Sequence, residues 1–239
     1  MSRYLVFQLY APLVSWGEAA VGEVRHSNAV PSRSALLGLL AAACGIRRDA
    51  PLMEAFIRHY HFAVRPLSSC EQWLRDYHTV EVPRQSRKRV YSTRRDELTQ
   101  APEELGTLIT TREYRCDAYY HIAVQETEGA PLALQKLAAA LVEPVLPLYL
   151  GRKSCPPALP LSPVILEGTL AEVFRQAEQT LVCPELTGML PAADFCYWEG
   201  EQQGVSPVIS VLRSDQPLSK VRWQFTTRRQ FSGTFREEK

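Results

Sequence analysis

RYLVFQLY, residues 3–10, is the stretch on which the rest of the fold is predicted to assemble. Its Leu, Val, Phe and Tyr side chains favour extended structure, and such a run predicts a β-strand that is buried on at least one face. Ala11-Pro12 ends the run. The chain therefore begins with a strand, and the elements that follow it indicate which sheet that strand joins.

A helix is predicted next, in the run PSRSALLGLLAAAC that starts at Pro31. Ser32 or Ser34 is a suitable N-cap, and Gly45 is a natural stop. Further elements are predicted as a short helix at about 51–59, strands at 60–65 and 112–126, a helix at 132–142 and a possible strand within 143–150. This order is the β-α-β-β-α-β pattern of a ferredoxin-like α+β fold.

A long polar segment, about 70–111, separates the second and third predicted strands. Such a segment inside a domain is usually a functional loop or a projecting hairpin. It contains PRQSRKRVYSTRR, residues 83–95, which has no acid. Its cations are Arg84, Arg87, Lys88, Arg89, Arg94 and Arg95. Because the whole chain has a formal net charge of only +1, this local excess indicates a polyanion such as nucleic acid, or else a solvated loop.

The chain changes character after residue 155, becoming Pro-rich, then acidic, then strand-like at 205–213 and 220–227. We therefore predict a ferredoxin-like domain at 1–155, with an insertion at about 80–111, and a smaller β-rich lobe at 156–239. Acids dominate 160–201 and bases dominate 220–236. Such uneven charge is typical of a protein that binds RNA on one face and protein on another.

No sequence motif for a nucleotide-binding loop, a serine hydrolase or a zinc site is present. His61 and His121 fall inside predicted strands and are expected to be structural histidines with hydrogen-bond partners. A metal-independent ribonuclease could use His78 with Tyr77 or Lys88 as general acid and base. The six cysteines form no metal-binding pairs, so we expect reduced thiols, no metal and no cofactor. With no apolar run long enough to span a bilayer, a cytoplasmic protein is predicted.

Two further basic motifs have both a functional and a simpler interpretation. LGRKSCP at 150–156 combines a glycine, two cations and a hydroxyl, which suits a phosphate but also a charged tight turn. RRQF at 228–231 could contact phosphate and stack on a base, or could be a basic tail.

Several blocks resemble a known family in the same order along the chain: MSRYLVFQLYAPLVSWGE at 1–18, PSRSALLGLLAAACGIRRD at 31–49, RDYHTV at 75–80, REYRCDAYYHIAV at 112–124 and PLYLGRKSCPPALPL at 147–161. They are similar to the Cas-five-type subunits of type I-E CRISPR Cascade complexes, which belong to the RAMP superfamily. The resemblance implies a projecting thumb at about 80–111 and a subunit that grips the 5′ handle of the CRISPR RNA (crRNA). It also implies contacts with the backbone (Cas-seven-type) subunit and the large (Cas-eight-type) subunit, with target DNA reached only through the assembled complex.

The residues expected to contact RNA are Arg25, Arg33, Ser34, His78, Arg84, Arg87, Lys88, Arg89, Arg94, Arg95, Arg112, Tyr149, Gly151, Arg152, Lys153, Ser154, Arg228 and Arg229. No catalytic residue is expected, because in type I-E systems a separate subunit cuts the precursor RNA. The alternatives are a metal-independent endoribonuclease that processes precursor crRNA and a scaffold that binds only protein.

Overall fold

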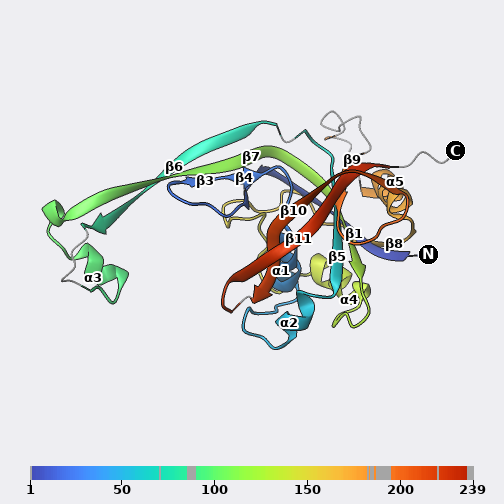
Figure 1. The fold of residues 1–239 in the computed structure, drawn as a ribbon, viewed down its shortest axis with the longest axis horizontal. Helices are drawn as coiled ribbons and strands as arrows, with labels where there is room; N and C mark the ends of the chain where they lie inside the picture. The colour runs from blue at the N-terminus through green and yellow to red at the C-terminus, as the bar shows by residue number, and fades with distance from the viewer. Residues whose placement is uncertain are drawn as a thin grey trace.

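The computed structural model describes residues 2–69, 71–84, 90–181, 183, 186, 195–219 and 221–235. Within them one nine-stranded sheet has the strand order β10-β11-β9-β5-β7-β1-β8, and β3 and β6 add to it by pairing with β7 (Figure 1). Its strands are β1 (Ser2–Val14), β3 (Val24–Arg25), β5 (Tyr60–Pro66), β6 (Trp73–Pro83), β7 (Leu105–Glu126), β8 (Val164–Gly168), β9 (Phe195–Trp198), β10 (Val205–Ser219) and β11 (Gln224–Phe235). All its pairings are antiparallel except that of β3 with β7.

The remaining elements are a small ribbon and the helices. They are β2 (Trp16–Gly17), β4 (Ser27–Asn28), α1 (Arg33–Ala43), α2 (Leu52–Phe56), α3 (Arg94–Leu98), the 3-10 turn η1 (Pro102–Glu104), α4 (Leu134–Val142) and α5 (Leu170–Leu181). The fold is therefore a mixed α/β fold built on a mostly antiparallel sheet.

Strand β1 is buried on both faces, because helices cover the sheet on both sides. Leu5 and Phe7 belong to the larger apolar core, which also holds the buried apolar residues of α1, α2 and α4. Tyr4 and Val6 point the opposite way and belong to a second core with α5. The alternation of side chains in a strand produces this division. The predicted strand is confirmed. Its sequence predicted burial on at least one face, and both faces are buried.

Helix α1 begins and ends where its sequence predicts. The Ser32 side chain accepts a hydrogen bond from the Ala35 N–H and is the N-cap. Gly45 has a φ of 69°, in the left-handed region that favours glycine, and its N–H donates to the Ala42 carbonyl. The glycine stop is therefore confirmed.

The possible strand within 143–150 is wrong. Pro144 and Pro147 cannot donate to a strand ladder, and the segment runs as an irregular connection. The strand that pairs with the free side of β1 is instead β8, which lies beyond residue 155. The sheet then continues through β9, β11 and β10, so the predicted division at 155 is not a break in the sheet. Whether 1–155 and 156–239 are separate folding units stays a prediction.

Helix α5 was not expected, because residues 156–239 are predicted to be β-rich. Its signal was nevertheless present as the capping box T-x-x-E. The Thr169 hydroxyl accepts from the Glu172 N–H at 3.3 Å, and the Glu172 carboxylate accepts from the Thr169 N–H at 2.6 Å. The bonds from Thr169 hold the pKa of Glu172 below its usual range. Apolar residues at helical spacing bury one face of α5 against the sheet.

We expect Thr169→Ala to lower the free energy of unfolding by about 1 kcal/mol, because the first turn of α5 loses its side-chain acceptor. Thr169→Ser keeps the hydroxyl and is the matched control. Urea unfolding followed by circular dichroism compares the two variants with the parent chain. An equal loss in both variants would contradict a capping role.

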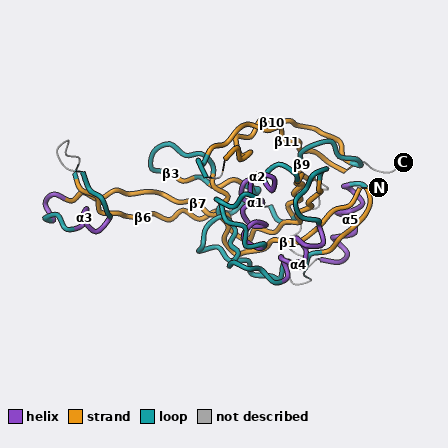
Figure 2. The backbone as a smooth tube through the Cα atoms, turned by 90° about the horizontal axis from the view of Figure 1, so that it is seen from below, coloured by secondary structure: helices purple, strands orange, loops and turns teal. Residues whose placement is uncertain are grey.

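The polar segment predicted as a loop or projecting hairpin is a hairpin. Strands β6 and β7 pair from Trp73↔Arg115 to Pro83↔Leu105. We call residues 73–84 and 90–115 the arm. It extends away from the body of the molecule and carries α3 near its far end (Figures 1 and 2). Of the basic stretch, Arg87, Lys88 and Arg89 lie outside the described residues.

Two searches of the described residues bear on the function classes. No helix among them is long and apolar enough to cross a membrane. No group of three or more His, Cys, Asp or Glu side chains in the same part of the chain could hold a metal ion.

Candidate nucleic-acid interface

The basic elements predicted from sequence lie in different parts of the molecule. Arg94 and Arg95 belong to α3, near the far end of the arm (Figure 1). Arg152 contacts Tyr114, where the arm joins the body. Arg229 is exposed on β11. In the strand order, β9 and β5 lie between β11 and the arm strand β7. These elements therefore do not form one surface.

The arm end is ordered by its own contacts. The Thr93 side chain and the Asp96 carboxylate form a capping box that begins α3. The Arg94 guanidinium pairs with Glu97 and donates to the Glu81 carbonyl. Arg84 and Arg95 are exposed. The acids that follow residue 95 thus neutralise part of the charge that the basic stretch carries.

Three of the predicted RNA-contacting arginines meet at the base of the arm. Arg25 in β3 pairs in register with Arg112 in β7, so the two residues lie side by side. Tyr114 is two residues further along the same strand and faces the same side. The Arg152 guanidinium lies 4.8 Å from the centre of the Tyr114 ring. No carboxylate pairs with Arg25, Arg112 or Arg152 within the described part of the chain. We call these three arginines the arm-base cluster.

The opposite face of the arm base carries a second set of cations that sequence reasoning missed. Glu113 is 4% exposed and accepts from Arg75 Nε at 3.1 Å, while His26 Nδ1 lies 3.0 Å from its other oxygen. Burial acts to raise the pKa of Glu113, but the bonds from His26 and Arg75 outweigh it and hold the pKa below its usual range. Arg75 and Arg115 both lie over the Trp73 ring. A charged carboxylate thus fixes the strands that carry the cluster.

The possible catalytic group is not assembled in the described residues. His78 is exposed on β6. Tyr77 faces the other side of the ribbon, because neighbouring residues in a strand point to opposite faces. Lys88 lies outside the described residues.

Two predicted RNA contacts, Arg33 and Arg228, must be corrected. Arg33 is 3% exposed, pairs with Glu199, and donates to the carbonyls of Tyr60 and Ile57. Arg228 forms a two-pronged pair with Asp215 at 2.7 and 2.9 Å and also meets Glu199 at 3.4 Å. The terminal nitrogens of Arg33 and all three guanidinium nitrogens of Arg228 contact this network, so we remove both residues from the candidate RNA contacts.

The glycine in LGRKSCP is explained by packing. A Cβ at Gly151 would lie 1.8 Å from the Ser15 carbonyl oxygen, and its φ is 92°. The Leu150 N–H donates to the Cys155 carbonyl, which closes the turn. Lys153 and Ser154 are exposed on this turn. The turn thus presents Arg152 to the arm base, and the close approach of Ser15 is what requires a glycine at 151.

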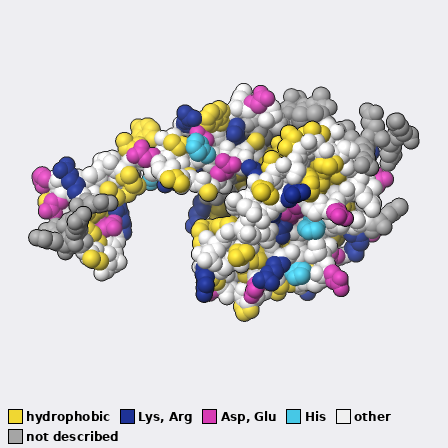
Figure 3. Space-filling model, in the orientation of Figure 1, with side chains coloured by type: hydrophobic (Ala, Val, Ile, Leu, Met, Phe, Trp, Pro, Cys, Tyr) yellow, Lys and Arg dark blue, Asp and Glu magenta, His cyan; other side chains and the backbone are white. Residues whose placement is uncertain are grey.

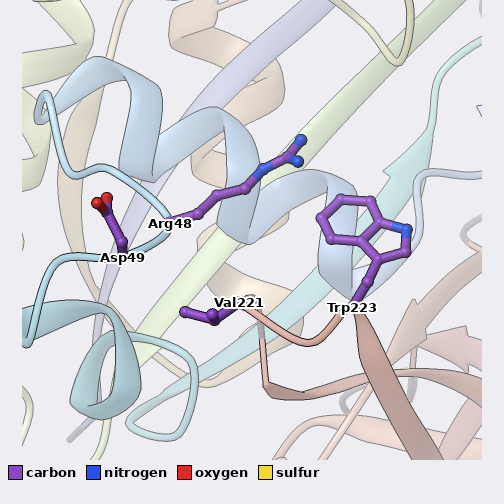
Figure 4. A pocket seen from close by; sticks show the side chains of 4 residues that line it. All are labelled: Arg48, Asp49, Val221 and Trp223. Carbon is purple, nitrogen blue, oxygen red and sulfur yellow. The ribbon is translucent and has the colours of Figure 1, made fainter. Parts of the chain in front are cut away.

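The remaining predicted residues line a cleft beside α1. The cleft has a volume of about 590 Å³ and brings together Ser34 and Gly38 of α1, Tyr149 and Gly151 of the connection that follows α4, Trp223 immediately before β11 and Phe225 in β11. We call it the α1 cleft. An adjoining hollow shares Arg48 and Trp223 with it (Figure 4). Sequence reasoning missed Arg48 and Trp223, because nothing local shows that they meet.

Comparisons with known proteins agree on one family. A family model described as "CRISPR-associated protein (Cas_Cas5)" matches residues 4–231. The CRISPR system Cascade subunit CasD of Escherichia coli (strain K12) is 34% identical over 173 residues, which is 67% of this chain and 70% of that protein. A chain of a CRISPR RNA-guided surveillance complex has a TM-score of 0.66 and 25% identity, covering 97% of this chain and 90% of that one. A crystal structure of a Cas protein shares the fold, with a TM-score of 0.54 and 22% identity over 97% and 94% of the two chains.

Proposed function

The chain belongs to the Cas5 family of CRISPR-associated proteins, and from that premise we propose that it is a non-catalytic RNA-binding subunit of a type I-E CRISPR surveillance complex, Cascade. It grips the 5′ handle of the crRNA and caps the filament of backbone subunits for antiviral interference. The large subunit is a second protein partner, and target DNA is reached only through the complex. The cytoplasm is the compartment in which such a ribonucleoprotein would act.

The observation that carries this proposal is the arm-base cluster. Arg25, Arg112 and Arg152 form no ion pair within the described residues, although the register of β6 against β7 places Asp76 across from Arg112. Cations placed this way attract the phosphates of a single strand and gain free energy as counterions leave. Lys and Arg side chains are also visible along the edge of the body that faces the arm (Figure 3).

The order of the strands supports a ferredoxin-like core. Strands β5, β7, β1 and β8 are neighbours in the sheet, and when the short β2–β4 strands and the arm strand β6 are set aside they are the second, third, first and fourth strands along the chain. The arm is inserted between the second and third of them. We therefore infer that the arm is the thumb of a RAMP-type fold, and that the exposed candidates Arg84, Arg95 and His78 of the arm lie along RNA near the junction of handle and spacer.

Substitution of Arg112→Gln together with Arg152→Gln tests the proposal. Affinity falls as salt rises, and each phosphate contact on a single strand adds roughly 0.7 to the steepness of log affinity against log salt. If each arginine contacts one phosphate, the line becomes shallower by about 1.4 in the double variant. Affinity at low salt falls several-fold. The measurement is titration of the assembled complex with its guide RNA at several salt concentrations. The matched control is Arg3→Gln with Arg58→Gln, which removes two exposed cations elsewhere.

An unchanged salt slope in the arm-base variant would overturn the RNA-gripping assignment, and normal assembly without any RNA contact would favour a protein scaffold. The same proteins are incubated with repeat hairpin RNA in the absence of metal. Site-specific cleavage that is lost in His78→Ala would establish the endoribonuclease alternative.

A further inference from the structure

The nine-stranded sheet ends on one side at β10, which forms a long ribbon with β11 (Figure 1). Within the described residues β10 pairs only with β11, so its outer edge has no strand beside it. An edge strand presents a row of unpaired backbone N–H and C=O groups, and those groups can pair with another chain. The outer edge of β10 is therefore open to a further strand.

The two ends of this edge are irregular, but its middle is regular. The register of β10 against β11 shifts between Pro207 and Ile209 and again between Arg213 and Gln216. Proline and such irregularities are devices that prevent unwanted pairing at an edge. Between them, residues 209–213 pair in continuous register with β11. A run of this length rises about 17 Å, which is enough for one short strand to pair alongside it.

The side chains on this part of the edge are apolar and exposed. In the sequence VISVL at 208–212, the exposed fractions are 68% for Val208, 55% for Ile209, 44% for Val211 and 71% for Leu212. Because neighbouring side chains in a strand point to opposite faces, both faces of β10 are open to solvent here. Hydrophobic side chains gather over this ribbon on the face seen in Figure 3. An uncharged, β-branched edge of this kind is typical of an interaction site.

The charges around the edge indicate which kind of chain fits it. Residues 205–213 contain no acid, and Arg213 already pairs with Glu18 at 3.5 Å. Arg229 lies across from Leu212 in the register, is exposed, and forms no ion pair within the described residues. A strand that carries a carboxylate near Leu212 would pair with Arg229. A second copy of β10 has no acid in this run to offer, and a nucleic-acid strand cannot complete a β-ladder.

We propose that residues 209–213 of β10 take an extended segment of a different protein by β-strand addition. The segment forms main-chain hydrogen bonds with the outer edge, packs apolar side chains against Ile209, Val211 and Leu212, and places a carboxylate on Arg229. This inference rests on the proposed membership of a multisubunit complex, whose other proteins supply the segment. It assigns that contact to a strand separated from the arm strand β7 by β11, β9 and β5 in the sheet order.

Hydrogen–deuterium exchange followed by mass spectrometry tests the edge directly. The samples are the full-length chain alone, the chain with guide RNA, and the assembled complex of this chain, the guide RNA and the other protein subunits. Backbone amides at an unpaired edge exchange quickly, and pairing with a further strand slows them. We expect the fast-exchanging amides of 209–213 to exchange at least tenfold more slowly in the assembled complex than in the chain alone, with no change on addition of RNA alone.

Leu212→Glu gives the edge a carboxylate of its own beside Arg229, which neutralises that cation and repels the acid of the incoming segment. We expect this variant, bound to guide RNA, to have at least tenfold lower affinity for the remaining protein subunits, with unchanged affinity for the guide RNA. The matched control is Val142→Glu, which places the same charge at a 73% exposed apolar position of α4. Thermal unfolding of both variants checks that the fold is retained.

The outcomes separate this inference from the broader function. Equal exchange of 209–213 in all three samples would overturn it. Protection by guide RNA alone would identify a nucleic-acid contact, and protection of the chain alone that grows with concentration, together with a dimer in sedimentation, would identify a second copy; either result overturns it. If 209–213 are protected in the complex while Arg112→Gln with Arg152→Gln leaves the salt dependence of RNA binding unchanged, the RNA-gripping function fails and the edge contact stands.

Discussion

Glu199→Ala is expected to lower the free energy of unfolding by about 3–5 kcal/mol, the usual cost of removing one partner of a buried ion pair. Glu199 is 5% exposed and is the acid shared by Arg33 and Arg228. It also accepts from the Phe62 N–H at 2.8 Å. Its removal would leave the Arg33 guanidinium buried with only carbonyl acceptors. Urea unfolding at neutral pH measures the loss.

Two further variants distinguish loss of charge balance from loss of packing. Glu201→Ala removes an exposed acid two residues away and should change stability little. Arg33→Met with Glu199→Leu removes the charges of the pair together, and it should recover much of the loss, because Arg228 keeps Asp215. A double variant as unstable as Glu199→Ala would show that the network stabilises the fold through its geometry rather than its charge.

The parts of the fold predicted from sequence are those whose signals are local. The strand RYLVFQLY and the Ser32-capped helix are each predicted by a pattern of about a dozen residues. Strand β5 and helix α4 lie close to their predicted positions. Helix α5 could have been predicted from T-x-x-E, but the acidic surroundings hid its apolar stripe. The error at 143–150 arose because an apolar run was given more weight than its two prolines.

The candidate site was predicted less well, because exposure and pairing are not local properties. Arg33 and Glu199 are 166 residues apart, so no sequence window shows that the arginine is already neutralised. The arm-base cluster depends on the register of β3 against β7 and on a turn held by Gly151. Residue type identifies Arg25, Arg112, Arg152 and Arg228 equally as cations. Only the fold shows that Arg228 is ion-paired with Asp215 and Glu199, whereas the other three form no ion pair within the described residues.

His121 is a buried histidine that was predicted to have hydrogen-bond partners. It is fully buried, and neither ring nitrogen has a partner among the described residues, so the predicted hydrogen bonds are not found there. Arg65 is its cross-strand neighbour on β5, and Gln8 is its neighbour on β1. Burial, with a smaller effect from the Arg65 charge, lowers the pKa of His121 to about 3. The imidazole is therefore neutral in the folded protein, while in the unfolded chain it titrates near 6.5.

Acid should therefore destabilise the fold through His121. Between pH 6.5 and about 3 the unfolded chain binds a proton at this site and the folded chain does not, so stability is full above pH 6.5 and falls as the pH drops through that window. The full window corresponds to about 5 kcal/mol, at roughly 1.4 kcal/mol for each pH unit. His121→Leu removes the proton site and should flatten this part of the profile, with little loss at pH 8 because no hydrogen bond is broken. Urea unfolding of both proteins at pH 8, 6, 5 and 4 gives the difference, whereas parallel profiles would mean that His121 gains a partner or a proton in the folded state.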